Sequence, residues 1–240
     1  MSKKGALIVI EGTDGSGKAT QTKLLIERLN SGGISSKNMS FPRYHTPTGR
    51  IISQCYLGKK RAPEEGDVAW FGDADSVDPM LASLYYAADR YAAVPDMMKI
   101  LNSGTHLILD RYYQSNMAHQ GGKILESSRR LSFFEFERIL ELELLKIPKQ
   151  DLAIFLHMPA EVTLVLRKDR GEEIDGHEKN IEHILRAERV YLEMTRSYGY
   201  DWQIVSCAPD GTINSLKTPE SISEEIYSIV EDFLLRQKLL

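Results

Sequence analysis

Residues 11–20 read Glu11-Gly12-Thr13-Asp14-Gly15-Ser16-Gly17-Lys18-Ala19-Thr20 and separate two segments of different pattern. A continuous apolar run at 6–10 precedes them and predicts a buried strand, and leucines at helical spacing follow in 20–30. The glycines let the backbone turn tightly and bring its N–H groups close to phosphate oxygens, while Lys18 adds a positive charge at the helix start. Residues 12–20 are therefore predicted to form a phosphate-binding loop.

The loop departs from the usual pattern at one position. Gly12 and Gly17-Lys18 fit G-x-x-x-x-G-K, but Ala19 stands where Ser or Thr usually follows. That hydroxyl normally ligates Mg²⁺, so we expect Thr20, water or a residue from elsewhere to take its place. An ordinary glycine-rich turn between a strand and a helix is the alternative, and the flanking strand and helix argue against it.

Composition narrows the class of protein. The 240 residues suit one α/β domain over 1–240, and 30 Lys and Arg against 34 Asp and Glu leave a net charge of −4, which disfavours a nucleic-acid partner. No run is long enough for a signal core or a membrane span. Cys55 and Cys207 lie far apart without a metal-binding spacing, which indicates free thiols in a reducing compartment. We expect a cytoplasmic protein.

Strand and helix patterns alternate along the chain. This alternation predicts an α/β fold with a five-stranded parallel sheet and helices on both faces. Pro95 is expected to kink or break the long helix that Asp78 begins. The helix at 128–145 is apolar nearly all round, which suggests either a homodimer interface or a deep core position. The five predicted strands are 6–10, 38–41, 105–109, 151–156 and 202–207.

Several candidate ligand-binding residues lie where predicted strands end or helices begin. Phe41-Pro42-Arg43 follows the second strand, and Asp110-Arg111 follows the third, where Asp110 is expected to help hold Mg²⁺. Tyr86 and Arg90 share a helix face that suits a planar base, although such a pair is more often simple packing. The segment 115–122 either reads a ligand or is an ordinary polar loop. Arg167 and Arg170 open a polar break at 167–178 that suggests a small mobile lid, with a solvated charge run as the alternative.

Together and in order, these motifs resemble the thymidylate kinase family, which has the nucleoside monophosphate kinase fold of the P-loop NTPases. The resemblance covers most of the chain, and the phosphate loop is its most specific part. It implies transfer of a phosphoryl group from ATP to dTMP with Mg²⁺. It also implies that Asp14 contacts the sugar 3′-hydroxyl, Tyr86 stacks on thymine and Arg90 bonds a thymine carbonyl. The other residues that it places at the substrate are Phe41, Arg43, Arg111, Ser115, Asn116 and Gln120.

The same resemblance assigns the catalytic cations. Arg43 and Arg111 would meet the acceptor phosphate, and Lys18 would meet the donor. Because 13–16 contains no basic residue, Arg167 and Arg170 look like the lid cations of the family. Tyr86 stands where Phe is common and His119 where many members have Tyr, and these two departures bear on selectivity for base and sugar.

The expected chemistry needs no general base. A monophosphate acceptor has a second pKa near ~6 and is already an anion at neutral pH, so catalysis is a matter of position and charge. Three alternatives stay open: a kinase of related fold for another nucleoside monophosphate or a deoxynucleoside, a nucleotide-dependent switch, and a non-catalytic paralogue suggested by Ala19. A GTPase switch would show Asn-Lys-x-Asp, whereas the nearest string, at 148–151, lacks the Asn.

Overall fold

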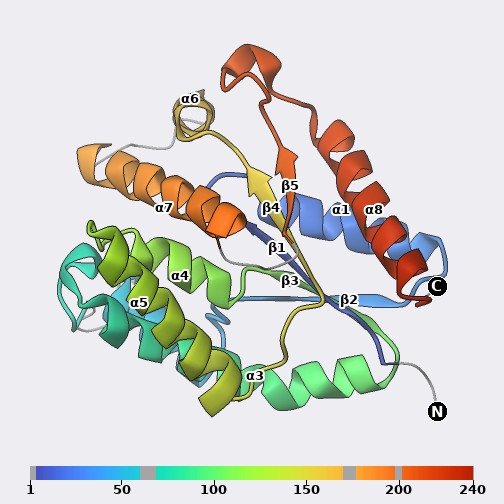
Figure 1. Cartoon of the computed structure of the whole chain (residues 1–240), viewed down its shortest axis with the longest axis horizontal. Coiled ribbons are helices and arrows are strands. Elements are labelled where there is room, and N and C mark those ends of the chain that lie inside the picture. The colour runs from blue at the N-terminus through green and yellow to red at the C-terminus, as the bar shows by residue number, and fades with distance from the viewer. Residues whose placement is uncertain (1–3, 60–68, 170–176, 198–201, 240) are drawn as a thin grey trace.

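The computed structural model describes residues 4–59, 69–169, 177–197 and 202–239. Five strands form one sheet in the order β2-β3-β1-β4-β5, and every neighbouring pair is parallel. The predicted sheet is therefore confirmed, with β1 at its centre (Figure 1). The strands are β1 (Leu7–Gly12), β2 (Ser36–Ser40), β3 (His106–Asp110), β4 (Leu152–His157) and β5 (Trp202–Ser206).

Helices connect successive strands. A π-helical segment, Ile51–Tyr56, continues α2, and another, Ile139–Leu144, continues α5. Short 3₁₀ turns lie at Ala74–Ser76 and Ile213–Ser215. None of the described helices has the length and apolar content needed to span a membrane. The α-helices are α1 (Lys18–Ser31), α2 (Pro47–Arg50), α3 (Pro79–Asn102), α4 (Tyr113–Gly121), α5 (Ser127–Arg138), α6 (Ala160–Asp169), α7 (His177–Ser197) and α8 (Pro219–Arg236).

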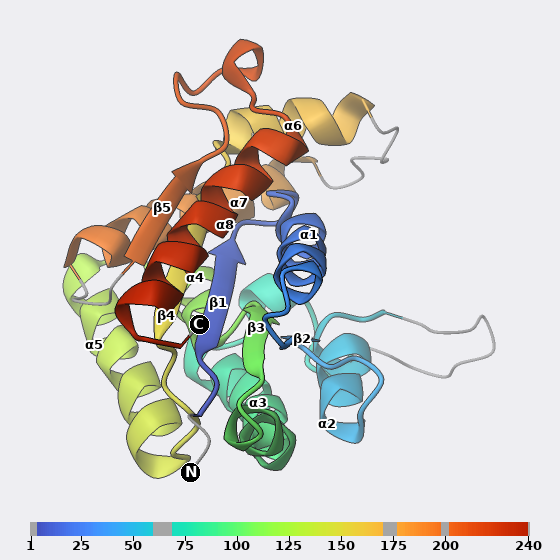
Figure 2. The same cartoon turned by 90° about the vertical axis from the view of Figure 1, so that its right-hand side faces the viewer.

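The sheet is covered on both faces, as its continuous apolar strands require. Helices α1 and α8 lie against one face, and α3, α4, α5 and α7 lie on the other (Figures 1 and 2). Alternate residues of β1 point to opposite sides because side chains in a strand alternate. Ile8 and Ile10 join the core under α1 and α8, whereas Leu7 and Val9 join the core under the other four helices.

The structure excludes a break at Pro95 and the polar-loop alternative for 115–122. The long helix is not broken at Pro95, because α3 runs unbroken from Pro79 to Asn102. Pro95 lies on the exposed side, where water can bond the carbonyl that the proline leaves without a donor, and the buried Met97 and Leu101 hold the last turns. The segment 115–122 is not an ordinary polar loop either, since it lies largely in α4. Tertiary packing there overrides the polar composition.

The helix predicted at 128–145 is buried on one side and exposed to solvent on the other. Phe133 and Phe134 are buried under the sheet, whereas Leu131 and Leu144 are exposed. The core alternative therefore holds for the aromatic residues of α5. The exposed leucines are too far apart on this helix to form a continuous apolar stripe.

Candidate active site

The loop between β1 and α1 wraps around the side chain of Lys18. The Lys18 ammonium donates a hydrogen bond to the carbonyl of Thr13 at 2.7 Å and is buried. Gly17 caps α1 with a φ of 88° and a ψ of 10°, a left-handed conformation that favours glycine. At Gly12, a Cβ atom would lie 2.5 Å from Ser16 Oγ and 3.0 Å from the Leu156 carbonyl oxygen. Gly17 thus meets a conformational requirement of the loop and Gly12 a steric one, since a side chain at Gly12 would collide with Ser16 and Leu156.

The loop holds polar groups that protein atoms leave unsatisfied. Among the described residues, the hydroxyls of Thr13 and Ser16 are buried without a hydrogen-bond partner. Burial, together with the nearby Arg111 charge, lowers the pKa of Lys18 to about 8, against the opposing pull of the Asp14 and Asp110 carboxylates. A bound phosphate would offer acceptors to these hydroxyls and a counter-charge to Lys18.

Glu11 ties this loop to the helices behind it. Its Oε1 accepts hydrogen bonds from the backbone N–H groups of Tyr112 (2.7 Å) and Ser115 (3.2 Å). Its Oε2 accepts hydrogen bonds from the hydroxyls of Ser115 (2.6 Å) and Tyr191 (2.7 Å). Burial raises the pKa of this carboxyl, and the two hydroxyl donors, the Arg111 charge and the Tyr112 N–H lower it in part. The Ser115 side chain, predicted to bind substrate, therefore bonds Glu11.

Arg111 lies at the junction of the phosphate loop and α4. Its backbone has a φ of 69°, and its N–H donates to the carbonyl of Ile10 at 3.1 Å. Its guanidinium forms an ion pair with Asp14 of the phosphate loop and donates to Ser115 Oγ at 3.2 Å and to His119 Nε2 at 2.9 Å. Partial burial raises the pKa of Asp14, but its neighbours together, Arg111 foremost, outweigh this effect and lower that pKa below the usual range.

Asp110 fits a role beside a divalent cation. It ends β3, its Oδ1 is buried, and no described residue bonds that atom. Burial raises the pKa of its carboxyl, although Lys18 and Arg111 oppose the rise. No three His, Cys, Asp or Glu side chains of the described chain gather into a metal site. One carboxylate suits Mg²⁺, which takes its remaining ligands from phosphates and water. Thr20, the other predicted ligand, is exposed on α1 beside Ala19.

A cavity of about 680 Å³ opens beside these groups. It brings together residues that the sequence separates by more than a hundred positions. It also includes residues that the sequence did not single out, among them Tyr56, Asp75 and His183. The predicted substrate residues that line it are Asp14, Phe41, Tyr86, Arg90, Arg111, Ser115, Asn116 and Gln120.

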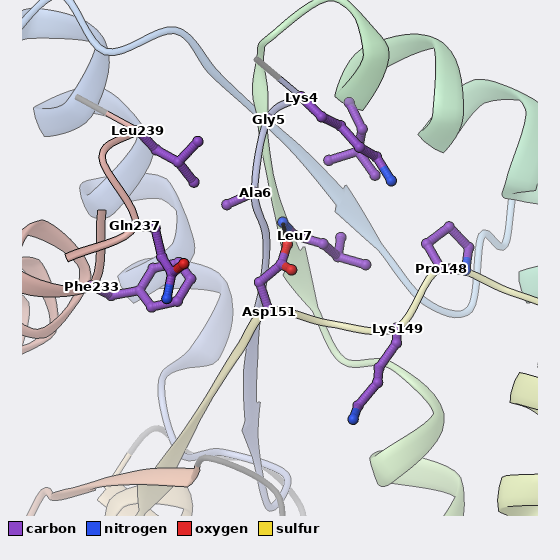
Figure 3. Close-up of a pocket in the computed structure, with 11 residues that line it drawn as sticks. Lys4, Gly5, Ala6, Leu7, Pro148, Lys149, Asp151, Phe233, Gln237 and Leu239 are labelled. Carbon is purple, nitrogen blue, oxygen red and sulfur yellow. Dashed lines mark hydrogen bonds between the residues drawn. The ribbon is translucent and has the colours of Figure 1, made fainter. Parts of the chain in front are cut away.

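A smaller cavity of about 270 Å³ lies at the opposite end of the sheet (Figure 3). Lys4, Lys149 and Asp151 surround it before β1 and β4 begin, and Asp151 Oδ2 accepts a hydrogen bond from the Leu7 N–H at 2.7 Å. Open α/β sheets bind ligands beyond the carboxyl ends of their strands. The larger cavity, at those ends, is therefore the candidate site.

Arg43 lies just outside the cavity lining. Its Nη2 donates to the Asp89 carbonyl at 3.0 Å, its Nε is 3.4 Å from Asp89 Oδ1, and its backbone N–H donates to Asp89 Oδ2 at 2.7 Å. The guanidinium carbon is 6.0 Å from the centre of the Phe41 ring, which lines the cavity. The turn after β2 is thus fixed to α3, and Arg43 packs behind Phe41.

Two buried glutamates hold the predicted base-reading residues. Arg90 forms an ion pair with Glu141, to which its Nε donates at 2.9 Å, and the Asn116 amide donates to both oxygens of Glu137 at 3.2 and 3.0 Å. Burial and the neighbouring Glu141 raise the pKa of Glu137 to about 7, against the pull of Arg90. Glu137 and Glu141 are four apart on the helix face that also carries Phe133 and Phe134, and this apolar setting is the signal in the sequence that could have found them.

The structure shows fewer contacts for the remaining predicted residues. Tyr86 packs edge-on against Tyr56 with ring centres 5.7 Å apart, and Gln120 Nε2 donates to the Tyr56 hydroxyl at 3.1 Å. Arg167 belongs to α6. Arg170 and 171–176 of the predicted lid lie outside the described residues, so the lid stays a prediction.

Comparisons with known proteins agree with this geometry. A family model described as thymidylate kinase matches residues 10–212. The chain is 29% identical to the thymidylate kinase of Homo sapiens over 96% of its length and 92% of the relative. It is 30% identical to that of Mycobacterium tuberculosis, over 85% of the chain and 92% of the relative. The fold is similar to that of a Candida albicans thymidylate kinase, with a TM-score of 0.66 and 24% identity over 97% and 93% of the two chains.

The ion pair between Arg90 and Glu141 predicts a large loss of stability on Glu141→Ala. Removing one partner of a buried pair leaves an uncompensated charge, and we expect the free energy of unfolding in urea to fall by ~3–5 kcal/mol. Glu143→Ala in the same segment is the matched control, because Glu143 pairs with Arg138 at the surface. We expect it to cost less than ~0.5 kcal/mol. Equal losses for both variants would contradict this account of Arg90.

Proposed function

The chain belongs to the thymidylate kinase family, and we propose that its phosphate loop holds ATP while the adjoining cavity holds dTMP. The activity is ATP-dependent phosphorylation of dTMP to dTDP. One observation above all supports the proposed placement. Arg111 bonds Asp14 of the phosphate loop and also lines the cavity, so its guanidinium lies where a donor phosphate and an acceptor phosphate would meet.

On the acceptor side, we propose that Tyr86 stacks on the base and Arg90 reads one of its carbonyls. Both side chains line the cavity, and the ion pair with Glu141 fixes the guanidinium plane of Arg90. We propose that Asp14 contacts the sugar hydroxyl and that Arg43 and Arg111 bind the acceptor phosphate. Phe41, Ser115, Asn116 and Gln120 complete the proposed dTMP site.

On the donor side, we propose that backbone N–H groups of residues 12–20 and the Lys18 ammonium bind the ATP phosphates. Asp110, with Thr20 or water, is the proposed protein contribution to an Mg²⁺ site. When bound, Mg²⁺ would neutralise charge on the phosphates between which the bond breaks. Arg167 and Arg170 remain the proposed lid cations.

The proposed chemistry depends on position and charge. The dTMP phosphate has a second pKa near ~6 and attacks as an anion, so no residue has to remove a proton from it. Two anions must still approach in line, and Lys18, Arg43 and Arg111 oppose their repulsion. The pairs that Arg43 forms with Asp89 and Arg111 with Asp14 hold these cations in place.

We further propose that residues 1–240 form one thymidylate kinase-like domain that works as a homodimer in the cytoplasm. Free, buried Cys55 and Cys207 fit a reducing compartment. For the dimer, α3 is a better candidate than α5, because its outer face carries exposed apolar residues at helical spacing. These are Leu81, Leu84, Ala88, Tyr91 and Pro95.

Release of ADP from Mg·ATP with a panel of acceptors tests the proposed function. We expect dTMP to be clearly preferred over dUMP, UMP, dCMP, AMP and thymidine, because the chain belongs to the thymidylate kinase family. Tyr86 and Arg90 add a pocket that suits a planar pyrimidine better than the purine of AMP. Lys18→Ala is the negative control and should abolish turnover with every acceptor. Preference for another monophosphate would require reassignment of the base-reading residues, and ATP binding without any turnover would favour a non-catalytic role.

The depressed pKa of Lys18 predicts how ATP use depends on pH. Lys18 is charged below its pKa of about 8 and neutral above it, so kcat/KM for ATP, which reports the free enzyme, should fall above about pH 8. Bound phosphates favour the charged form, and kcat at saturating ATP should therefore fall at a higher pH. Activity restored on return to pH 7.5 excludes unfolding. Identical profiles for kcat and kcat/KM would contradict this assignment.

The exposed face of α3 predicts the site of dimer contact. Leu84→Glu should convert the dimer to a monomer in sedimentation velocity, since it places a charge in the apolar stripe. Leu131→Glu, at an exposed leucine of α5, is the matched control and should leave the dimer intact. If only the α5 variant dissociates the protein, the interface lies on α5. If the unaltered protein sediments as a monomer, the homodimer proposal is wrong.

A further inference from the structure

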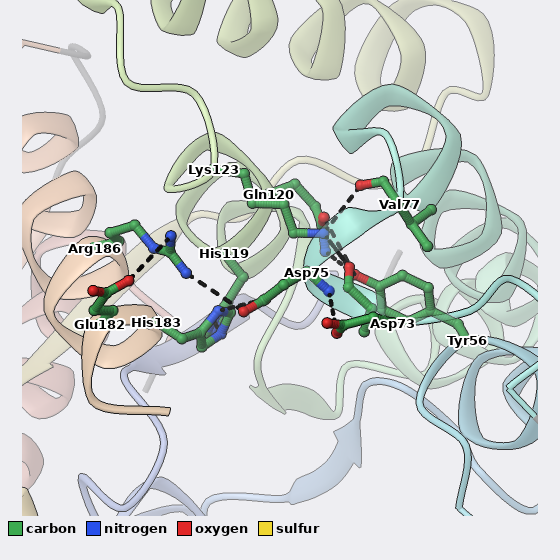
Figure 4. A network of polar contacts seen from close by, with 11 residues as sticks. Tyr56, Asp73, Asp75, Val77, His119, Gln120, Lys123, Glu182, His183 and Arg186 are labelled. Carbon is green, nitrogen blue, oxygen red and sulfur yellow. Dashed lines mark hydrogen bonds and ion pairs between the residues drawn. The ribbon is translucent and has the colours of Figure 1, made fainter. Parts of the chain in front are cut away.

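Two stacked histidines adjoin Arg111 in the proposed dTMP site. Figure 4 shows these histidines beside Asp75. His119 comes from α4 and His183 from α7, and their ring centres are 5.1 Å apart with planes inclined by 17°. Nδ1 of His119 is 2.9 Å from Nε2 of His183, and Nε2 of His119 is 2.9 Å from Nη1 of Arg111. At the far end, Nδ1 of His183 lies 3.6 Å from Oδ1 of Asp75. Four residues from four segments thus form one chain of polar contacts.

The direction of each hydrogen bond in this series follows from the guanidinium of Arg111 at one end. A guanidinium can only donate, so Nε2 of His119 must be the unprotonated acceptor. The single proton of His119 then lies on Nδ1, which donates to Nε2 of His183. The proton of His183 consequently lies on Nδ1, the nitrogen that faces the Asp75 carboxylate. Asp75 and His183 therefore fix the tautomer of His119 that Arg111 requires.

We propose that His183 and Asp75 are positioning residues that act through His119 on Arg111 and so set the affinity for the dTMP phosphate. The inference rests on the proposed role of Arg111 at that phosphate. His183 belongs to α7, the helix that follows the predicted lid, and Asp75 belongs to the 3₁₀ turn Ala74–Ser76, so neither adjoins a recognised motif. Arg186 of α7 bonds the second oxygen of Asp75 at 3.5 Å and orients that carboxylate.

Loss of these polar contacts would affect the binding of dTMP more than the binding of ATP. With the opposite tautomer, His119 would point an N–H at the N–H of Arg111 across 2.9 Å, a contact between two donors. Arg111 would still be bound to Asp14, on the phosphate loop, but it would lose the shorter of its two contacts to α4 and keep only the 3.2 Å hydrogen bond to Ser115 Oγ. The acceptor phosphate would then meet a guanidinium that is held less firmly on its α4 side, and dTMP binding would weaken more than ATP binding.

This series of polar contacts from Arg111 to Asp75 also requires both histidines to be neutral. Burial, then the Arg111 charge, lowers the pKa of His119 well below its ordinary value, and burial lowers that of His183. His119 faces Arg111, Asp14, Lys18, His183 and Tyr191, and His183 also faces Asp75, Arg186 and Lys123. Since both pKa values are lowered, the imidazoles gain a proton only in acid. A proton on either Nε2 removes an acceptor and breaks the chain.

Two variants of His183 test the proposal at pH 8, where the dTMP phosphate is fully ionised. Leu cannot accept the His119 proton, and we expect His183→Leu to raise KM for dTMP about tenfold, with KM for ATP and kcat nearly unchanged. The amide oxygen of His183→Gln can accept that proton and should restore most of the affinity. Equal thermal unfolding midpoints show that both variants are folded. Equal effects of the two substitutions on KM, or none, would overturn the proposal.

The pH dependence provides a second test. From pH 8 to pH 5.5, KM for dTMP should rise more in the unaltered protein than in His183→Gln, which lacks one of the two titrating imidazoles. Ionisation of dTMP itself affects both proteins equally and cancels in the ratio. Parallel profiles would contradict the inference.

Failures of the underlying assignments give different results. If the unaltered protein does not phosphorylate dTMP, the proposed function fails. If it does but Arg111→Ala leaves KM for dTMP unchanged, the role of Arg111 fails. If both hold and His183→Leu has no effect, only the present inference is wrong.

Discussion

The buried carboxylate of Glu11 is the point on which the site depends. It lies at the end of the central strand, and its four hydrogen bonds reach the segment after β3, α4 and α7. A buried carboxylate without donors would be costly, so these elements are constrained to stay where they satisfy it. Because Tyr112 and Ser115 are among the donors, the backbone that directly follows Arg111 is fixed to the same strand that leads into the phosphate loop. Donor and acceptor sites are thereby held in one frame.

The local part of this arrangement could be predicted from the sequence. The phosphate loop, the order of strands and helices, and the ends of the strands follow from short patterns, because glycine conformations, strand periodicity and helix caps are set by neighbouring residues. Asp78 does begin α3, where its carboxylate accepts hydrogen bonds from the N–H groups of Met80 and Leu81 at 2.9 and 3.1 Å. The cavity lined by Asp14, Tyr86 and Arg111 follows from these placements together with the resemblance of the motifs.

The partners of the site residues could not be predicted in this way. Glu11, Glu141 and His183 act across separations of 51 to 180 positions, as in the bond from Tyr191 to Glu11, and no local pattern specifies such a contact. The polar α4 was hard to recognise for the same reason. The Ser115 hydroxyl and the Asn116 amide nitrogen donate to glutamates from β1 and α5, and these hydrogen bonds are visible only once the sheet and helices are assembled.

The arginines at the acceptor side share one electrostatic design. Arg43 is paired with Asp89, Arg90 with Glu141 and Arg111 with Asp14, so each guanidinium is oriented before any phosphate or base arrives. Orientation in advance reduces the reorganisation that binding two anions would otherwise demand. The partners differ in burial, however: Glu141 is fully buried, whereas the Asp14 side chain is 55% exposed. Arg90 is therefore held rigidly, as the base-reading role that we propose for it requires. Arg111 keeps a partner at the surface that can yield to the phosphate we place there, and the histidines behind it supply, in our proposal, the constraint that Asp14 does not.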